Sequence, residues 1–239
     1  MSAPQSAPSP RPAGNSGTKN IVLALVAGLV LAGAGYSIWR QLQPKQQYKF
    51  DPATFAFQDH VGSNASLTDD VEHLPLVSTA GAPFDLGQYQ GKKNVVLVIT
   101  RGNTTGATPG PYFGKICLYC ATQTSRLIAN YQSFQDAGAE VVVVFPVKQV
   151  AESEQVGQFK EAVGRTGNAG SEPPFPLVLD VELKAVDKLG IRADLAKPAT
   201  YILDKDGQLR FAYVGASMAD RPSVAAMLEQ LADINVSAK

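Results

Sequence analysis

Two short, continuous runs of apolar residues restrict most strongly what this 239-residue chain can fold into. They are residues 94–100 (NVVLVIT) and 140–146 (EVVVVFP). A run of this kind is typical of a strand that is buried on both faces, as in a parallel sheet covered by helices on each side. We therefore expect both runs to lie at the centre of such a sheet.

The rest of the C-terminal part alternates between helical and strand-like patterns. The turn signal at residues 204–207 (DKDG) joins two strands into a hairpin. Strands are predicted over residues 74–77, 83–86, 175–179, 201–203 and 209–214. Helices are predicted over residues 117–135, 149–163, 180–189 and 223–234. This order predicts an α/β fold with a central mixed sheet flanked by helices, in a domain over residues 71–236.

The N-terminal part is expected to lie outside that domain. Residues 1–20 are rich in Pro, Ser, Ala and Gly and are predicted to be a disordered tail. Residues 21–39 carry no charge, and a helix of that length would span about 28 Å, near the thickness of a bilayer's hydrocarbon layer. Tyr36 and Trp39 fall where amphipathic aromatic side chains prefer the headgroups. We predict an N-terminal transmembrane helix, followed by a polar tether over residues 40–70.

A signal peptide is the alternative interpretation of residues 21–39. Residues 32–34 (AGA) resemble a cleavage site, but a polar lead of residues 1–20 is long for a cleaved signal, so an anchor or uncleaved signal is favoured. Basic residues are balanced on the two sides of the segment, so the positive-inside rule gives no orientation. From the usual behaviour of N-terminal anchors, we expect a single-pass membrane protein with its domain outside the cytoplasm.

Composition excludes two classes of protein. Lys plus Arg and Asp plus Glu both number 21, and no basic cluster is visible, so there is no electrostatic case for a nucleic-acid partner. The chain has only two cysteines, Cys117 and Cys120, whereas disulfide-stapled scaffolds have many more. Two cysteines at this spacing close a very small ring, which indicates chemistry rather than scaffolding.

The pair Cys117-Leu118-Tyr119-Cys120 opens a predicted helix just after a buried strand. Residues three apart share one face of a helix, close enough for a disulfide. Unpaired N–H groups and the positive dipole end at a helix start lower the pKa of a cysteine there, and Lys115 adds to that effect. We assign Cys117 as the catalytic nucleophile and Cys120 as the resolving thiol.

Two other roles for the cysteines are possible from the sequence. A zinc site needs more ligands, and the only histidines, His60 and His73, lie far upstream in an order that fits zinc fingers poorly. An inert structural pair is the other alternative. Because a dithiol itself carries electrons, no metal or organic cofactor is implied, but a redox partner must reset the pair.

The chain resembles the redoxin branch of the thioredoxin superfamily, which includes alkyl hydroperoxide reductase and thiol-specific antioxidant proteins. The resemblance rests on residues 74–100 (LPLVSTAGAPFDLGQYQGKKNVVLVIT), the CLYC motif and residues 197–215 (KPATYILDKDGQLRFAYVG), and covers residues 74–231. It implies a thioredoxin-like fold. It also implies that Pro198 is a cis-proline that faces the cysteines and contacts the substrate; a trans proline entering a strand is the alternative. We further expect Tyr119 to contact the substrate.

The chain departs from the family pattern before the cysteines. Peroxiredoxins carry Pro and Thr or Ser seven and three residues before the peroxidatic cysteine. Those positions are Gly110 and Gly114 before Cys117, and Phe113 and Cys117 before Cys120, so the hydroxyl that would hold a peroxide is missing at either spacing. Ile116 replaces the tryptophan of thioredoxins, and the preceding strand offers no acid to act as base. The long loop at residues 101–116 either shapes substrate access or is a tolerated insertion.

These patterns lead to three ranked hypotheses. The first is a thiol–disulfide oxidoreductase that acts on protein or small-molecule disulfides near a membrane. The second is a peroxiredoxin-like thiol peroxidase with Cys117 as the peroxidatic cysteine. The third is a tethered, non-enzymatic binding module whose cysteines are structural.

Overall fold

The two apolar runs form neighbouring strands at the centre of one sheet. β3 (Asn94–Ile99) pairs in parallel with β4 (Ala139–Val147), which pairs in parallel with β5 (Leu177–Val181). Alternate residues of β3 enter opposite cores, with Val96 and Val98 on one side and Leu97 on the other. Both faces are therefore buried, as the continuous apolar pattern predicts.

A computed structural model describes residues 55–67, 70–102, 116–150, 154–167 and 170–237, which belong to one compact unit, Tyr48–Lys239. The predicted tail and membrane segment, residues 1–39, lie outside the described residues, as does most of the loop at 101–116. Of the helices within the described ranges, none has the length and apolar character needed to cross a bilayer.

Four further strands extend the central three into a mixed, seven-stranded sheet. The additional strands are β1 (Leu76–Ser78), β2 (Pro83–Phe84), β6 (Ala199–Leu203) and β7 (Leu209–Val214). Their order is β2-β1-β5-β4-β3-β6-β7, and every pairing outside the central three is antiparallel. The predicted terminal hairpin is confirmed, because β6 and β7 pair across the turn at residues 204–207.

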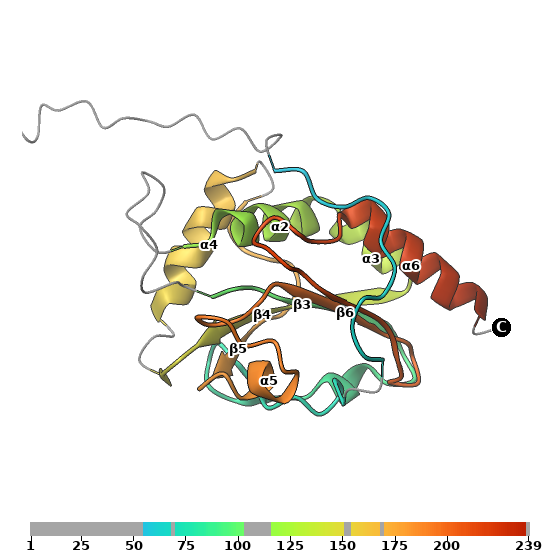
Figure 1. Ribbon diagram of the computed structural model, residues 1–239, viewed down its shortest axis with the longest axis horizontal. Coiled ribbons are helices and arrows are strands. Elements are labelled where there is room, and N and C mark those ends of the chain that lie inside the picture. Colours follow the sequence, from blue (N-terminus) through green and yellow to red (C-terminus); the bar gives the residue numbers. More distant parts are fainter. Residues whose placement is uncertain (1–54, 68–69, 103–115, 151–153, 168–169, 238–239) are drawn as a thin grey trace, which may run out of the picture. The chain divides into compact units, whose positions relative to one another are not determined.

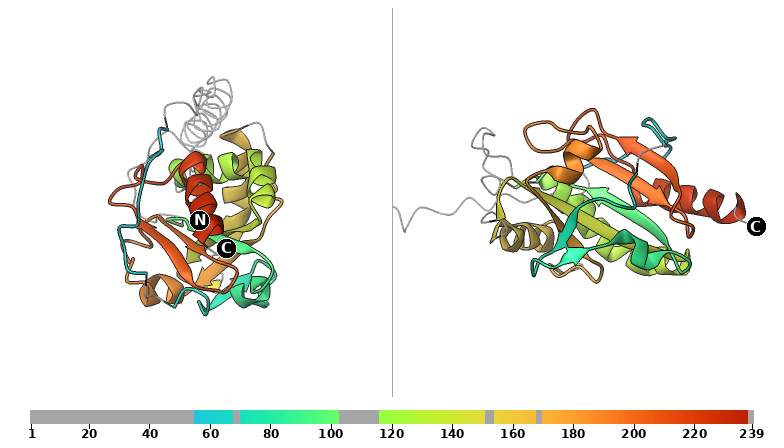
Figure 2. Two further views of the ribbon diagram at one scale, coloured as in Figure 1. Left: turned by 90° about the vertical axis from the view of Figure 1, so that its right-hand side faces the viewer. Right: turned by 90° about the horizontal axis from the view of Figure 1, so that it is seen from below.

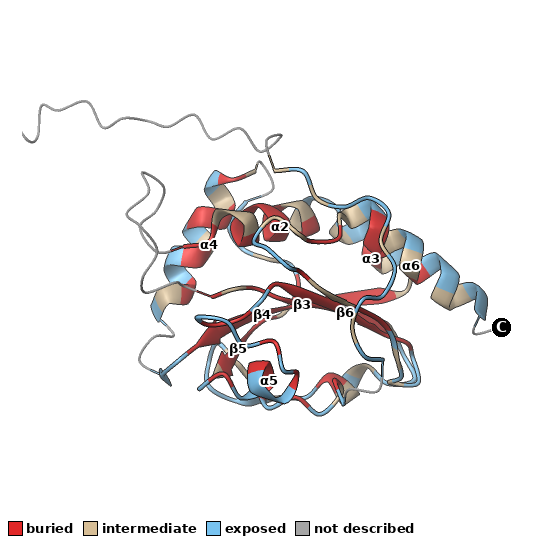
Figure 3. Ribbon diagram, viewed as in Figure 1, coloured by how far each residue is buried: buried red, intermediate tan, exposed pale blue. Residues whose placement is uncertain are grey.

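Helices cover both faces of the sheet. Figure 1 shows one group of helices above the sheet and the short helix α5 (Lys184–Lys188) below it. The left view of Figure 2, turned by 90° about the vertical axis, again shows the sheet between these layers. The strands and the inward sides of the helices are buried, whereas the outer helix surfaces are exposed (Figure 3). The upper group comprises α2 (Leu118–Ala129), α3 (Tyr131–Asp136), α4 (Gln155–Arg165) and α6 (Val224–Ser237), and η2 (Leu86–Tyr89) contributes to the lower core.

The helix predicted over residues 117–135 is two helices. Asn130 lies between them, with φ −114° and ψ 15°, outside the helical range. Its side-chain amide donates a hydrogen bond of 2.8 Å to the carbonyl of Arg126 in the last turn of α2. Asn favours helix ends because its side chain can form hydrogen bonds with backbone groups in place of the helical ones. The periodicity of apolar residues does not reveal such a bond, so it does not predict the break.

Residues 55–66, here called the strap, run along the outside of the domain. Gln58 pairs with the turn that precedes α6: its N–H donates to the carbonyl of Arg221, and its carbonyl accepts from Ser223, both at 2.8 Å. The side-chain amide of Asn64 donates to the carbonyl of Val214 in β7, and its amide oxygen accepts the N–H of the same residue. The strap falls within the range predicted to be a polar tether, and these bonds place it against the sheet and α6.

Asp180, near the end of β5, holds α5 in the lower layer through its carboxylate. Its fully buried carboxylate accepts the N–H groups of Ala185 and Val186, both at 2.9 Å, in the first turns of α5. We expect Asp180→Ala to lower the free energy of unfolding by about 1–3 kcal/mol, because two buried donors lose their acceptor. Chemical denaturation followed by circular dichroism measures this loss. The exposed turn variant Asp206→Ala serves as control, and equal stability of the two variants would contradict the capping role.

Candidate active site

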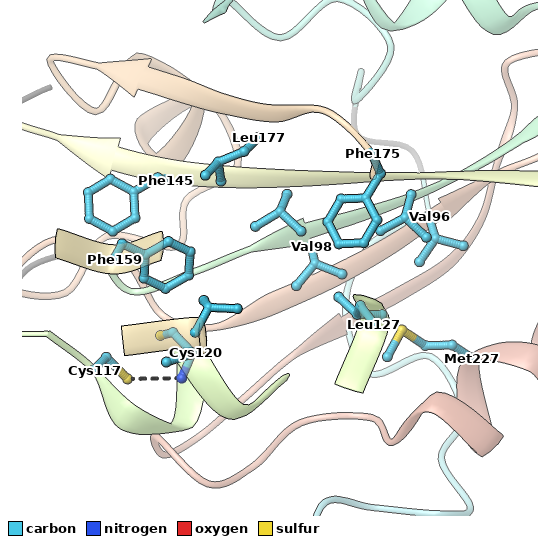
Figure 4. Packing of buried hydrophobic residues seen from close by; sticks show 14 of the residues in the cluster. Val96, Val98, Cys117, Cys120, Leu127, Phe145, Phe159, Phe175, Leu177 and Met227 are labelled. Carbon is cyan, nitrogen blue, oxygen red and sulfur yellow. Dashed lines mark hydrogen bonds between the residues drawn. The ribbon is translucent and has the colours of Figure 1, made fainter. Parts of the chain in front are cut away.

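Cys117 lies at the helix start that the sequence predicts. It is the N-cap of α2, with extended backbone angles (φ −72°, ψ 109°), and its Sγ accepts the N–H of Cys120 at 3.4 Å. Figure 4 shows this bond and the two cysteines beside the apolar core. The sulfur thus occupies the place where an N-cap oxygen usually satisfies a free backbone donor.

Cys120 lies one turn further along α2 and faces the sheet. Its Sγ accepts the N–H of Arg101 at 3.3 Å, just beyond the end of β3. Cys120 is 1% exposed and Cys117 is 8% exposed, so both sulfurs are shielded from bulk solvent. Both cysteines are free thiols. The junction between strand and helix therefore holds a buried dithiol.

The guanidinium of Arg221 contacts both sulfurs. Its Nη2 lies 3.2 Å from the Sγ of Cys120 and 3.8 Å from the Sγ of Cys117. Its Nη1 donates to Gln123 Oε1 at 2.7 Å, and its Nε donates to the carbonyl of Met218 at 2.8 Å. Every guanidinium nitrogen therefore has a partner, and the fork is fixed in one orientation.

Arg221 is only 1% exposed, which makes its charge unusual. A buried charge is costly unless an opposite charge compensates for it. Among the ion pairs of the described residues, none joins a carboxylate to Arg221. The groups left to carry the compensating negative charge are the two sulfurs, so the arrangement favours one thiolate.

The two thiols differ in acidity. Burial raises the pKa of Cys120, but the hydrogen bond with Cys117, the charge of Arg221 and the N–H of Arg101 together outweigh it and lower the pKa to about 6. The hydrogen bond with Cys120, together with burial, raises the pKa of Cys117 well above its usual value. The sequence predicts the acidic thiol at Cys117. The structure instead gives the lower pKa to Cys120, because the hydrogen bond between the two sulfurs favours the thiolate there and the nearest cation also lies closer to it.

The backbone around Arg221 is held from two sides. The carboxylate of Asp220 accepts the hydroxyl of Tyr213 at 2.5 Å and the N–H of Ala216 at 2.8 Å, which closes the turn after β7. A side chain at Gly215 would clash, since a Cβ there would lie 2.1 Å from the carbonyl of Asp220. The strap holds the carbonyl of Arg221 itself through Gln58. The guanidinium is thus aimed by main-chain bonds as well as by Gln123.

Among the described residues, neither of the two residues predicted to contact substrate makes a hydrogen bond to the sulfurs or to Arg221. Tyr119 is partly exposed, and its ring packs edge-on against Phe55 of the strap, with centroids 4.5 Å apart. Pro198 is buried, and its carbonyl accepts the N–H of Gly215 at 2.8 Å. The cis geometry expected at Pro198 is wrong, because the described residues contain no cis peptide bond; the proline simply leads into β6. Substrate contact by either residue stays a prediction.

The histidines weighed as zinc ligands lie elsewhere. The imidazole of His60 is 3.6 Å from Glu229, and that of His73 is 2.8 Å from Asp70, both on exposed surface. Within the described ranges, no group of three or more His, Cys, Asp or Glu residues is placed to hold a metal ion.

Arg221 was not identified by sequence reasoning, which places this position just before the helix predicted over residues 223–234. It is 101 residues from Cys120, and no spacing rule links the two positions. One available signal was the lack of a base near the cysteines, which implied that some other group must stabilise a thiolate. Many lysines and arginines could have met that requirement, so the sequence alone did not select one.

Arg221→Met should raise the pKa of Cys120 because it removes the nearest positive charge. With a pKa of about 6, most Cys120 is thiolate at pH 7, whereas a thiol near the ordinary value of about 8.5 is only a few per cent ionised. Titration of the ultraviolet thiolate absorbance of the reduced protein measures the change. Arg221→Lys, which keeps the charge but not the fork, should give a smaller rise. An unaltered titration in Arg221→Met would refute the assignment.

Gln123→Met should raise the same pKa by less than Arg221→Met does. The substitution keeps the side-chain volume but removes the acceptor that fixes Nη1, so the guanidinium loses its orientation while its charge remains. The exposed Gln132→Met on α3 is the matched control. A titration curve for Gln123→Met that superimposes on that of Gln132→Met would show that Gln123 does not position the cation.

Known proteins share the fold of this chain. No curated protein matches the chain. Among solved structures, similar folds include the mitochondrial 2-Cys peroxiredoxin of Plasmodium falciparum (TM-score 0.51, 18% identity, 75% of this chain and 98% of that chain). Another is peroxiredoxin 6 of Arenicola marina (TM-score 0.52, 16% identity, 75% of each chain). These likenesses show a thioredoxin-like, peroxiredoxin-type fold.

The sequence itself carries the assignment further. Residues 67–212 match the AhpC/TSA family, a stretch that includes both cysteines and ends before Arg221. The matched stretch is more than half of the chain, and the protein therefore belongs to the AhpC/TSA family.

Proposed function

We propose that this protein is a thiol peroxidase in which Cys117 and Cys120 cycle between a dithiol and an intramolecular disulfide. The observation that carries the proposal is the buried guanidinium of Arg221 in contact with both sulfurs. A cation in this place stabilises a thiolate, which is the nucleophilic form of cysteine. A structural pair of cysteines has no need of such a cation.

The burial of the sulfurs favours a small oxidant. Cys120 is 1% exposed and Cys117 is 8% exposed, so the disulfide of a folded protein cannot reach them without rearrangement. A hydroperoxide is small enough for a narrow approach, and membership of the AhpC/TSA family supports this substrate class. The hydroxyl absent at Gly114 is a missing donor in the family pattern, and the N–H groups of Arg221 supply donors from a different part of the chain.

A disulfide reductase is the second candidate. The spacing of the cysteines and the place of Cys117 at the N-cap of α2 favour it, because the same geometry suits attack on a disulfide. Both candidates use the same dithiol, and both need a thiol reductant to reset it. They differ in the oxidant, so the oxidant decides between them.

Reaction of the reduced protein with hydrogen peroxide and with an organic hydroperoxide tests the proposal. We expect two thiols to disappear per chain, a disulfide between Cys117 and Cys120 by mass spectrometry, and a second-order rate far above that of a free thiol. Cys117→Ser and Cys120→Ser should each reduce steady-state turnover to that of the reductant alone. A free-thiol rate with peroxide together with rapid insulin reduction would reject the peroxidase and favour the second candidate.

We further propose that residues 21–39 attach this domain to a membrane, as a single-pass anchor. Their uncharged sequence and the aromatic residues at its end support the proposal. Expression of the full chain and of residues 41–239 in parallel, followed by alkaline extraction of membranes, tests it. The full chain should resist extraction and the shorter chain should not, and release of both would refute the anchor.

A further inference from the structure

We propose that the two sulfurs divide the catalytic cycle: Cys120 attacks the oxidant, and Cys117 resolves the product and then receives the external reductant. This inference rests on the proposed function. It exchanges the roles that the sequence predicts from position along the helix, with Cys117 as nucleophile and Cys120 as resolving thiol. It follows from three features of the site: the placing of hydrogen-bond donors, the exposure of each sulfur and the stability of each leaving group.

The donors favour Cys120 as the attacking sulfur. Its Sγ receives the N–H of Arg101 at 3.3 Å and the Nη2 of Arg221 at 3.2 Å, from two elements outside its own helix. The Sγ of Cys117 receives the Cys120 N–H at 3.4 Å and lies further from Arg221, at 3.8 Å. The negative charge is therefore better stabilised on Cys120.

Gln123 adds a donor for the oxidant beside the same guanidinium. Its Oε1 is held by Arg221, while its Nε2 is buried and has no hydrogen-bond partner among the described residues. An unpaired buried N–H is costly, and an oxygen of a bound hydroperoxide would satisfy it. We assign this amide, together with the guanidinium that contacts Cys120, as the donors to the oxidant.

The exposures favour Cys117 as the sulfur that meets the reductant. Cys117 is the less buried of the pair and precedes the first turn of α2, whereas Cys120 faces the sheet. A reducing thiol is larger than a hydroperoxide and must align with the S–S bond. Such a thiol can approach the sulfur at the N-cap more easily than the sulfur behind it.

The oxidative half-reaction balances with these roles. The Cys120 thiolate attacks the terminal oxygen of a hydroperoxide, the O–O bond breaks, and the alkoxide or hydroxide leaves and takes up a proton. The sulfenic acid formed on Cys120 is then attacked by the sulfur of Cys117. An S–S bond forms, and the hydroxyl leaves as water with the proton from the Cys117 thiol.

The reductive half-reaction uses the same charge. An external thiolate attacks the sulfur of Cys117, the internal disulfide breaks, and Cys120 leaves as a thiolate. Arg221 and the N–H of Arg101 stabilise this leaving group, and a better-stabilised leaving thiolate departs faster. A second external thiol then resolves the mixed disulfide on Cys117 and restores the dithiol. One fixed cation thus assists both halves of the cycle.

Single-cysteine variants and mass spectrometry test the division. With dimedone present to trap sulfenic acid, Cys117→Ser should react with hydrogen peroxide within roughly tenfold of the unaltered rate and carry the adduct on Cys120. Cys120→Ser should react at the rate of a free thiol. Sulfenic acid that forms rapidly on Cys117 in Cys120→Ser, with slow reaction of Cys117→Ser, would overturn the inference.

A measurement on the unaltered protein guards against variants that fold poorly. The protein is oxidised by one equivalent of hydrogen peroxide, mixed briefly with glutathione and quenched in acid, and the site of the mixed disulfide is mapped. Glutathione on Cys117 supports the inference, and glutathione on Cys120 overturns it. If the unaltered protein forms no disulfide with peroxide, the proposed function itself fails, which is a separate outcome.

Discussion

The active site depends on a single buried charge. Arg221 is enclosed between α2 and the turn before α6, where Gln123 and the carbonyl of Met218 satisfy its donors without neutralising it. Among its partners in the described part of the chain, only the two sulfurs can carry a compensating negative charge. A cation with no carboxylate among its described contacts therefore converts an ordinary pair of buried cysteines into a pair that holds one thiolate at neutral pH.

Most of the fold could be predicted because its signals are local. The apolar runs at residues 94–100 and 140–146 identified the central strands, and the turn at residues 204–207 identified the last hairpin. The break at Asn130 could not be predicted from periodicity, because the apolar pattern continues across it while the side chain bonds back to α2. The spacing of apolar residues shows which face of a helix is buried. A break within a helix depends instead on individual polar contacts, which that spacing does not show.

The site was predictable in place but not in its electrostatics. Spacing alone located Cys117 and Cys120 at a strand–helix junction, since the helix start is encoded in neighbouring residues. The order of ionisation reflects Arg221, which reaches the pair only through the tertiary fold. Local reasoning gave the effect to the helix start and to Lys115, and so assigned the lower pKa to Cys117. The hydrogen bond from Cys117 and a contact across 101 residues together give the lower pKa to Cys120 instead.

The position of the strap has a practical consequence for work on this protein. The family match begins at residue 67, so this residue is an obvious choice for the first residue of a shortened protein. A chain cut at that point would lack Gln58, and with it both main-chain bonds that hold the segment from Arg221 to Ser223. It would also uncover Tyr119 by removing Phe55. Recombinant protein intended for redox measurements should therefore start upstream of Phe55, even when the shorter version is well expressed.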